Sequence, residues 1–330
     1  NTGVVLAYLG NQVVCLDTNQ EKIDLYKQGK TPMWEPHLEE VLNLAKDNLT
    51  FTTSYDEANI LETDVIFITV GTPSLPDGNA DLSYVRHAAE SIAERLGDGF
   101  TVIVNKSTVP IGSGNWVETI MHEHFRETHP NGEISDFNVI SSPEFLAQGS
   151  AMRDSFYPDR IVIGSQCERS IARLKQLFSP LTEQSFEPPA GLPRPEGLTE
   201  VPLVVCDLTS AEMIKYAANA FLALKISYVN EIGRLAGKLG ADINAVAKGI
   251  GLDKRIGNRF LNAGIGWGGS CFGKDTAALV ATARDYKLDM PIIEAAREIN
   301  YGQRALVVDM LQDKLKILKG KHITLLGFSF

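Results

Sequence analysis

The sequence lacks several features that would place it in a special class of protein. No Cys-x-x-Cys pair occurs, and the four cysteines are far apart, at Cys15, Cys167, Cys206 and Cys271. A disulfide framework is therefore excluded, and a reducing compartment is favoured. No metal site is predicted from the loose cluster of His122, His124 and His129, which has no accompanying ligand spacing. No apolar run approaches the roughly 20 residues of a membrane helix, and no signal peptide is visible.

Positive charge is also scarce. The 31 lysine and arginine residues stand against 41 aspartate and glutamate residues, so the formal net charge is 31 − 41 = −10. With no basic stripe to offset this charge, neither nucleic acid nor a membrane surface is expected as a partner. The 44% apolar and 22% charged fractions are ordinary for a globular chain. A length of 330 residues predicts two or more domains, and we expect a cytoplasmic protein.

The two ends of the chain resemble interrupted elements. Residues 1–9 have the pattern of a helix, and residues 12–17 have that of a buried strand. Together they resemble the second half of a β-α-β unit whose first strand and glycine-rich turn are not in the sequence. Residues 322–330 have the pattern of a strand without a successor. We therefore expect a chain that is cut at both ends.

Apolar strands alternate with helical segments through the first half of the chain. The strands are predicted at residues 64–70, 101–105, 138–141 and 160–164. This alternation predicts an α/β fold with a Rossmann-like, doubly wound parallel sheet that is covered by helices on both faces. Such sheets bind ligands at the carboxyl edge of their strands. The proline-rich residues 187–202 are predicted to be a linker.

The second half of the chain is predicted to be helical. Residues 210–239 contain no proline and would form one helix of about 45 Å. A helix of this length suits a subunit interface, and it suits a bundle core equally well. We predict a Rossmann-like domain at residues 1–202, a helical central domain at residues 203–320 and the first strand of a further domain at residues 321–330.

Asp17 stands at the end of a predicted strand, where dinucleotide-binding folds carry an acidic residue. A carboxylate there hydrogen-bonds a ribose hydroxyl and repels a 2′-phosphate, which indicates NAD rather than NADP. A solvated aspartate in a turn explains the position equally well. Lys22 is placed to reach the same ribose or to remain a surface lysine.

The most specific motif is Gly-Ile-Gly-Trp-Gly-Gly-Ser-Cys-Phe-Gly-Lys-Asp at residues 264–275. Its glycines let the backbone approach a ligand closely and expose amide donors. Cys271 follows at the expected start of a helix, where amide dipoles and Lys274 favour a nucleophilic thiolate. Asp275, one turn later, is placed to hold a water or a hydroxyl. An isolated cysteine is more often a small buried residue, but this setting favours the nucleophile.

Other polar residues are candidates with an alternative explanation each. Glu144 follows a predicted strand and is placed to act as a general base, or to stabilise a helix N-terminus. Lys215 and Asn219 share a helix face, which would hold an oxyanion or a sugar hydroxyl or else be solvated. Arg255 would pair with a phosphate or remain a surface residue.

Five motifs resemble those of the UDP-glucose/GDP-mannose dehydrogenase family, and they occur in family order across essentially the whole chain. They are Val70–Pro73, Lys106–Pro110, Pro143–Leu146, Ala211–Asn219 and Gly266–Asp275. The last of these is most similar to the UDP-glucose branch of the family. The resemblance implies a four-electron oxidation of UDP-glucose at C6 to UDP-glucuronate, with two NAD reduced in one site.

The resemblance also implies roles for individual residues. Cys271 would form a thiohemiacetal and then a thioester, and Glu144 would assist its hydrolysis. The implied catalytic residues are Cys271, Lys215, Glu144, Asp275, Asn219 and Thr108. The implied cofactor-binding residues are Asp17, Lys22, Gly71, Thr72, Pro73, Thr108, Gln148 and Lys274. The implied substrate-binding residues are Glu144, Phe145, Leu146, Lys215, Asn219, Arg255, Asn262, Gly264, Gly266 and Gly268.

Two features of the resemblance concern single positions. Arg255 is expected to come from a neighbouring subunit of a homodimer or higher oligomer that forms through the long helix. Gln148 stands where many relatives carry a carboxylate, and an amide there positions groups but does not act as a base.

Three alternative functions share part of this pattern. A GDP-mannose or UDP-acetamidosugar 6-dehydrogenase would use the same chemistry on another sugar nucleotide. A non-catalytic dimerising relative would have no need for the set of reactive side chains. A two-electron hydroxyacid dehydrogenase would have no use for the nucleophilic Cys271.

Overall fold

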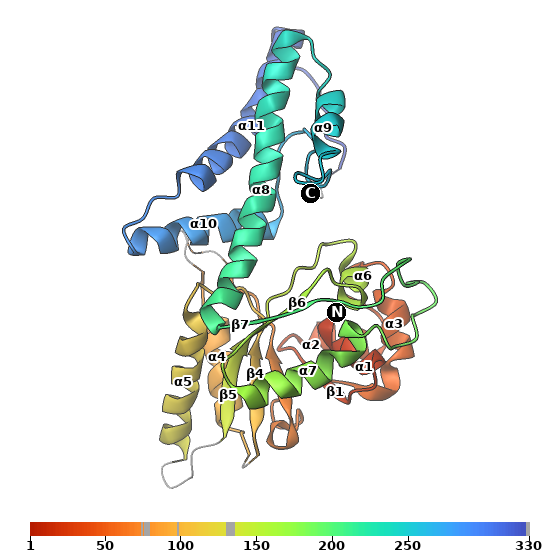
Figure 1. Ribbon diagram of the computed structural model, residues 1–330, viewed down its shortest axis with the longest axis vertical. Helices are drawn as coiled ribbons and strands as arrows, with labels where there is room; N and C mark the ends of the chain where they lie inside the picture. Colours follow the sequence, from red (N-terminus) through yellow and green to blue (C-terminus); the bar gives the residue numbers. More distant parts are fainter. Residues whose placement is uncertain (74, 76–79, 98, 130–135, 328–330) are drawn as a thin grey trace. The chain divides into compact units, whose positions relative to one another are not determined.

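The apolar segments of the first half form two sheets in the computed structural model, which describes residues 1–73, 75, 80–97, 99–129 and 136–327 (Figure 1). The strands are β1 (Val13–Leu16), β2 (Leu49–Thr52), β3 (Val65–Ile68), β4 (Thr101–Asn105), β5 (Phe137–Ser141), β6 (Ile161–Gly164) and β7 (Leu203–Cys206). Strands β1 and β2 form a parallel pair, and the second sheet has the order β3-β4-β5-β6-β7. The parallel pairing of β3, β4 and β5 confirms the prediction from the sequence.

The sheet is not parallel throughout, contrary to the prediction. Strands β5 and β6 are antiparallel and share the pair Ser141–Gly164, whereas β6 and β7 are parallel to each other. The connection between β5 and β6 contains only the short helix α6 (Ala151–Phe156). A parallel neighbour needs a crossover that passes over a face of the sheet, and this connection does not supply one.

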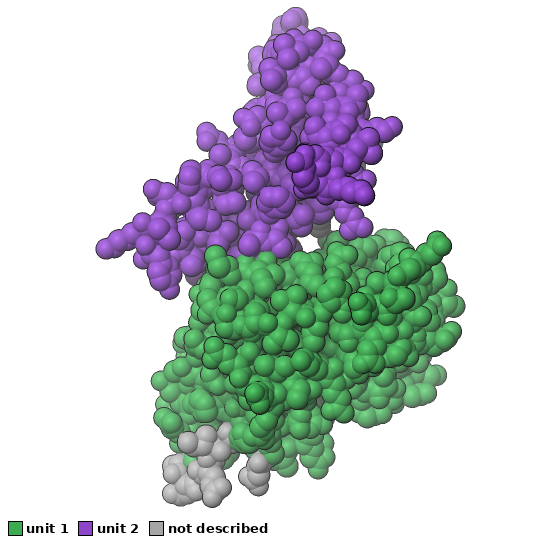
Figure 2. All heavy atoms as spheres, viewed as in Figure 1, with its two compact units in different colours: residues 1–72, 82–215 green, residues 73–81, 216–330 purple. Residues whose placement is uncertain are grey.

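The remaining α-helices occur in both halves of the chain. They are α1 (Thr2–Tyr8), α2 (Gln20–Lys27), α3 (Leu38–Leu44), α4 (Ser83–Ala93), α5 (Ser113–Thr128), α7 (Glu168–Thr182), α8 (Leu208–Leu239), α9 (Ile243–Gly251), α10 (Ser270–Asp285) and α11 (Pro291–Leu315). The chain divides into two compact units, which Figure 2 shows in green and purple. Unit 1 comprises Asn1–Thr72 and Leu82–Lys215, and unit 2 comprises Pro73–Asp81 and Tyr216–Phe330.

The core of unit 1 lies on both faces of the larger sheet, because successive side chains of a strand point to opposite faces. Val102 and Val104 of β4 pack with residues of α1, α3 and α7, whereas Ile103 packs with residues of α4 and α5. All five residues of β4 are buried. Unit 1 is therefore a Rossmann-like layered domain with helices on both faces of its sheet, as predicted.

The proline-rich residues 187–202 are not the linker that the sequence predicted. Leu192 and Val201 are buried in the core of unit 1, and Tyr157 Oη donates a hydrogen bond of 2.6 Å to the Leu192 carbonyl. Proline fixes an extended backbone but does not require exposure, so the segment packs along the unit. It leads into β7, which belongs to the same sheet, and unit 1 continues beyond the predicted boundary at residue 202 to Lys215.

The second half is helical, as predicted. Helix α8 has 32 residues and therefore a length of about 48 Å. The strand predicted at residues 322–330 is not formed over residues 322–327, which have no strand partner, and residues 328–330 lie outside the described part. Among the helices that the structure describes, none combines the length and the apolar character of a membrane span.

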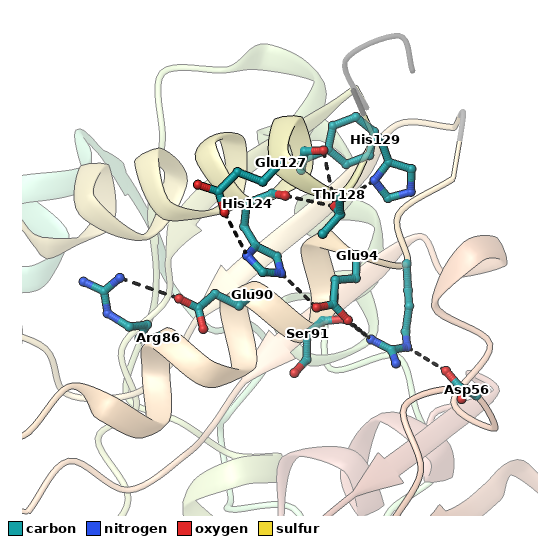
Figure 3. Close-up of polar contacts among 11 residues, drawn as sticks. Asp56, Arg86, Glu90, Ser91, Glu94, His124, Glu127, Thr128 and His129 are labelled. Atoms are coloured by element: carbon teal, nitrogen blue, oxygen red, sulfur yellow. Dashed lines mark hydrogen bonds and ion pairs between the residues drawn. The ribbon is translucent and has the colours of Figure 1, made fainter. Parts of the chain in front are cut away.

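The three clustered histidines make separate contacts around α5. His124 Nε2 lies 2.9 Å from Glu94 Oε1 at the end of α4, and Arg95 links the same glutamate to Asp56 (Figure 3). His122 and His129 pack against aromatic rings, with ring centroids 4.5 Å and 4.4 Å apart respectively. This network joins α4 to α5. In the described parts of the chain, no three His, Cys, Asp or Glu side chains gather in a metal-binding group.

Candidate active site

Two loops follow β3 and β4 at the carboxyl edge of the sheet in unit 1. They contain two of the motifs from the sequence, and hydrogen bonds tie them together. Thr72 Oγ1 donates to the Thr108 carbonyl at 2.7 Å, and Ser107 Oγ donates to the Val70 carbonyl at 2.8 Å. The Lys106 amide continues the pairing of the strands with a bond to the Ile68 carbonyl. The structure therefore brings Thr72 and Thr108 together, in contact with each other.

Glu144 and Lys215 form an ion pair in unit 1, although they are 71 residues apart in the sequence. Lys215 Nζ lies 2.8 Å from Glu144 Oε1 and donates to the Glu144 carbonyl at 2.7 Å. The Leu146 amide donates to the other carboxylate oxygen at 2.6 Å. Burial raises the pKa of Glu144, but the neighbouring Lys215 and the hydrogen bonds outweigh it and hold that pKa below its ordinary value. Glu144 is therefore ionised at neutral pH.

Phe145 contacts two cations through its ring. The Arg160 guanidinium carbon is 3.6 Å from the centroid of its ring, and Lys215 Nζ is 5.6 Å from the same centroid. Cation–π contacts of this kind hold the ring face against the charges. The segment Pro143–Leu146 is therefore fixed through the carboxylate of Glu144, its backbone and the ring of Phe145.

Lys106 is a further charged group of this cluster, and it was not among the predicted site residues although it opens one of the motifs. Its Nζ lies 3.5 Å from the Ser142 carbonyl. Burial lowers the pKa of Lys106, Glu144 opposes this shift and Lys215 adds to it, and the resulting pKa is about 8. The position of a lysine directly after a buried strand at the carboxyl edge was the available signal.

Glu212 was also missed, although it lies three residues before Lys215 on α8. Its carboxylate accepts hydrogen bonds from the amides of Gly112 and Gly114, at 2.5 Å and 2.9 Å, at the start of α5. The side chain is buried. Burial raises its pKa, the two amide donors oppose this shift, and the resulting pKa is about 7. Glu212 thus ties α8 to the loop that follows Thr108.

Replacing Glu212 with glutamine is expected to change how stability depends on pH. The folded-state pKa of about 7 exceeds the ordinary 4.5, so over this interval the folded state keeps a proton that the unfolded state releases. Glu212 therefore contributes fully to the free energy of unfolding of the wild type below pH 4.5. This contribution is lost as the pH rises to 7, by an amount on the order of 3 kcal/mol, whereas glutamine does not titrate. Urea unfolding across this pH range measures the free energy of unfolding of both proteins. A constant difference between wild type and Glu212→Gln at every pH would contradict this expectation.

Cys271 lies in unit 2, in the first turn of α10 directly after the glycine-rich loop, as the sequence predicted. The residue is exposed, and its Sγ lies 3.8 Å from Ser270 Oγ. Lys274, which was predicted to favour the thiolate, has its Nζ paired with Asp275 Oδ1 at 2.9 Å. The thiol is thus presented to solvent at a helix N-terminus.

Asp275 is buried one turn after Cys271 and contacts Asn219 of α8. Asn219 Nδ2 donates to Asp275 Oδ2 at 2.6 Å, and Lys274 holds the other carboxylate oxygen. Asp275 is 1% exposed, and its carboxylate is held by one cation, Lys274, and one neutral amide, Asn219. Lys215 and Asn219 lie four residues apart on α8, as predicted, and each holds the carboxylate of a different candidate residue.

Other predicted site residues make contacts of their own. Asp17 directly follows β1 and pairs with Lys22 at 3.3 Å, and of the two residues Lys22 is exposed and Asp17 is partly buried. Arg255 pairs with Asp253 at 2.6 Å and is 88% exposed. Gln148 is exposed in a turn whose amides on either side are held by Asp154 and Glu35. Loops also contain six of the predicted glycine, proline and asparagine residues. Gly266 is partly buried, and the other five are exposed, at Gly71, Pro73, Asn262, Gly264 and Gly268.

Comparison with known proteins identifies both halves of the chain. Residues 1–182 match the NAD binding domain of the UDP-glucose/GDP-mannose dehydrogenase family, and residues 209–302 match its central domain. The UDP-glucose 6-dehydrogenase YwqF of Bacillus subtilis is 44% identical, and the match covers 100% of this chain and 69% of the relative. A UDP-glucose 6-dehydrogenase of Rhizobium meliloti is also 44% identical, with 100% and 71% covered.

Solved structures agree with these relatives. The UDP-glucose dehydrogenase of Pyrobaculum islandicum superposes with a TM-score of 0.86 at 38% identity, covering 97% of this chain and 69% of that one. The UDP-D-ManNAc dehydrogenase of Pyrococcus horikoshii gives a TM-score of 0.79 at 25% identity, with 96% and 69% covered. The chain therefore belongs to the UDP-glucose/GDP-mannose dehydrogenase family, and it is an NAD-dependent oxidoreductase.

Proposed function

We propose that this chain catalyses the four-electron oxidation of UDP-glucose at C6 to UDP-glucuronate, with two NAD reduced for each sugar. The names of the relatives support the substrate, since two of them at 44% identity are UDP-glucose 6-dehydrogenases. The observation that carries the proposal is the exposed thiol of Cys271 in the first turn of α10, followed one turn later by the buried carboxylate of Asp275. A dehydrogenase that stops at the aldehyde has no use for this nucleophile.

The residues at the strand ends of unit 1 fit NAD. The carboxylate of Asp17 directly follows β1, where a ribose hydroxyl binds in dinucleotide folds, and the hydrogen-bonded loops with Thr72 and Thr108 follow β3 and β4. NAD, when bound, accepts one hydride in each of the two oxidations. Asp17, Lys22, the loop Gly71–Pro73 and Thr108 would bind it, and Gln148 and Lys274 would support its position.

The first oxidation needs a group that accepts the hydroxyl proton as hydride leaves C6. Asp275 is suited to this role through a bound water, since its charge is held by Asn219 and Lys274 rather than by solvent. Thr108 would orient the same water or the substrate hydroxyl. The product of this step is the C6 aldehyde.

The second oxidation uses covalent catalysis. Cys271 Sγ adds to the aldehyde carbon and its proton passes to the carbonyl oxygen, which gives a thiohemiacetal. Loss of a second hydride and of the hydroxyl proton gives a thioester. Lys215, whose buried ammonium is fixed by the Glu144 carbonyl, would stabilise the oxyanion in both steps. Asn219, one turn further along α8, would keep Asp275 in position.

Hydrolysis completes the reaction. Glu144 is ionised at neutral pH and would take a proton from the attacking water, so that the thioester yields the carboxylate product and the free thiol. Water supplies the second oxygen of the carboxylate. The overall balance is one alcohol and one water converted to one carboxylate, with two hydrides and three protons released.

The finer aspects of binding are part of the same proposal. Phe145, Leu146, Asn262 and the glycine loop would bind the sugar nucleotide, with Arg255 contributed by a second subunit. A homodimer would form through α8, whose apolar residues Phe221, Tyr228 and Leu235 are exposed at intervals of seven residues. Regular spacing of this kind is typical of a helix that packs against another helix. The enzyme would act in the cytoplasm.

The yield of NADH tests this function. We expect about two NADH for each UDP-glucose consumed, because one thioester is formed and hydrolysed per turnover. The measurement is absorbance of NADH at limiting UDP-glucose, with the product identified by chromatography. A yield near one would contradict the thioester mechanism. Turnover with GDP-mannose or a UDP-acetamidosugar but not with UDP-glucose would retain the mechanism and change the substrate.

A further inference from the structure

Buried amide side chains hold the glycine-rich loop that precedes Cys271, and no motif of the sequence singles them out. Asn230 of α8 and Gln303 of α11 both bind Gly264 (helices labelled in Figure 1). Asn230 Oδ1 accepts a hydrogen bond of 2.7 Å from the Gly264 amide, and Gln303 Nε2 donates one of 2.8 Å to the Gly264 carbonyl. The N–H and the carbonyl of Gly264 are therefore both hydrogen-bonded to side chains, one from each of two helices.

Asn300 of α11 holds the loop at a second position. Its Oδ1 accepts a hydrogen bond of 2.7 Å from the Trp267 amide, and its Nδ2 donates one of 3.0 Å to the Trp267 carbonyl. The orientation of this amide is fixed, because only the oxygen can accept from the Trp267 N–H. Gly266 has a φ of 102°, and a Cβ at that position would overlap Asn300 Oδ1. Asn300 thus requires glycine at position 266.

The indole of Trp267 anchors the same segment. Its Nε1 donates to Ser227 Oγ at 2.9 Å, and Ser227 Oγ donates to the Ala296 carbonyl at 2.7 Å. The ring also meets Phe272 edge-on, with centroids 6.2 Å apart, and Phe272 directly follows Cys271. The loop and the first turn of α10 are therefore held by one connected set of contacts within unit 2.

The hydrogen bonds from Asn230, Gln303 and Asn300 leave other backbone donors of the loop free. The amides of Ile265 and Gly268 make no hydrogen bond with any described residue, and both residues are exposed. The groups of Gly264 and Trp267 are occupied, whereas these neighbouring N–H groups are available to a ligand. Backbone N–H donors in a glycine loop suit the hydroxyl and phosphate oxygens of a sugar nucleotide.

We infer that Asn300, with Asn230 and Gln303, positions the Gly264–Trp267 loop for the sugar nucleotide and thereby sets the affinity of the enzyme for that substrate. This inference rests on the proposed function, in which the loop binds the sugar nucleotide. A glycine-rich loop has many conformations, and ordering it on binding weakens the complex. Three buried amides that hold the loop in advance remove that cost. They are positioning residues, since they contact the loop and not the reacting atoms.

Asn300→Asp is the sharpest test, because it preserves size and the acceptor for the Trp267 amide while replacing the donor. The carboxylate oxygen would face the Trp267 carbonyl and repel it. We expect KM for UDP-glucose to rise on the order of tenfold, with kcat and KM for NAD within about twofold of wild type. Calorimetric titration of UDP-glucose without NAD gives the corresponding loss of binding. Gln303→Met, which removes the donor to Gly264 at similar length, is expected to act in the same direction.

Asn43→Asp is the matched control. Asn43 of unit 1 also donates through Nδ2 to backbone carbonyls, those of Gly29 and Glu39. The same chemical change is therefore made away from the amides that hold the glycine-rich loop. Its KM for UDP-glucose is expected to stay at the wild-type value. An unchanged KM for UDP-glucose in the folded Asn300→Asp and Gln303→Met proteins would overturn the inference. A fall in kcat alone, matching the fraction of each variant that is folded, would overturn it as well. Absence of UDP-glucose binding by wild type would instead overturn the proposed function.

Discussion

Replacing Cys271 with serine is expected to lower the rate of UDP-glucuronate formation by a factor on the order of 10³ or more. The substitution keeps size and leaves the start of α10 intact, since the side chain is exposed and supports no core packing. A serine hydroxyl is a far weaker nucleophile than a thiolate, and it does not retain the aldehyde between the two oxidations. Steady-state NADH formation and product chromatography measure the effect.

The control for this variant is Cys167→Ser. Cys167 is the residue before the first turn of α7, and serine is well suited to that position, so the same substitution is made without loss of a nucleophile. Its rate is expected to match wild type. A Cys271→Ser protein that still releases about two NADH per UDP-glucose at the wild-type rate would contradict covalent catalysis by Cys271.

The part of the fold that follows from local sequence was predicted correctly. Strand β4 is a run of apolar residues with a loop signal after it, and its residues are buried on both faces as expected. Strand β7 was missed because Leu203–Cys206 is short, follows prolines and is only partly buried. Its identity depends on pairing with β6, which lies some 40 residues earlier in the chain. A long-range partner of this kind leaves no periodicity in the strand itself.

The residues of the candidate site also divide into those that nearby sequence identifies and those that depend on partners far away in the chain. Cys271 and Asp275 were identified because the glycines, the thiol and the carboxylate are close in sequence. The partner of Glu144 was not identifiable, since Lys215 lies 71 residues away and its Nζ is held equally by the Glu144 backbone. Glu212 and the Gly112 amide that it binds are 100 residues apart in the sequence. Asn300 is a single amide residue in α11 and belongs to no sequence motif. Such residues are recognised only when the folded chain shows which backbone groups they hold.

Replacing Glu144 with glutamine is expected to slow hydrolysis of the thioester by about 10²–10⁴-fold, because an amide does not take a proton from water. Lys215 keeps its hydrogen bond to the Glu144 carbonyl, so the ammonium stays in place although its carboxylate partner is lost. The two oxidations are then faster than hydrolysis, and the enzyme collects as the acyl form on Cys271. Rapid mixing should show a burst of about two NADH per active site followed by slow turnover.

Intact-protein mass spectrometry after mixing identifies the trapped species. We expect a covalent adduct of UDP-glucuronate on the Glu144→Gln protein, released by hydroxylamine, and no adduct when Cys271→Ser is added to it. Glu168→Gln, in the first turn of α7, is the matched control and should turn over as wild type does. Linear NADH formation at the wild-type rate, without an adduct, would show that hydrolysis does not depend on Glu144. Its ion pair with Lys215 would then serve to fix the buried ammonium, and the base would have to be sought elsewhere.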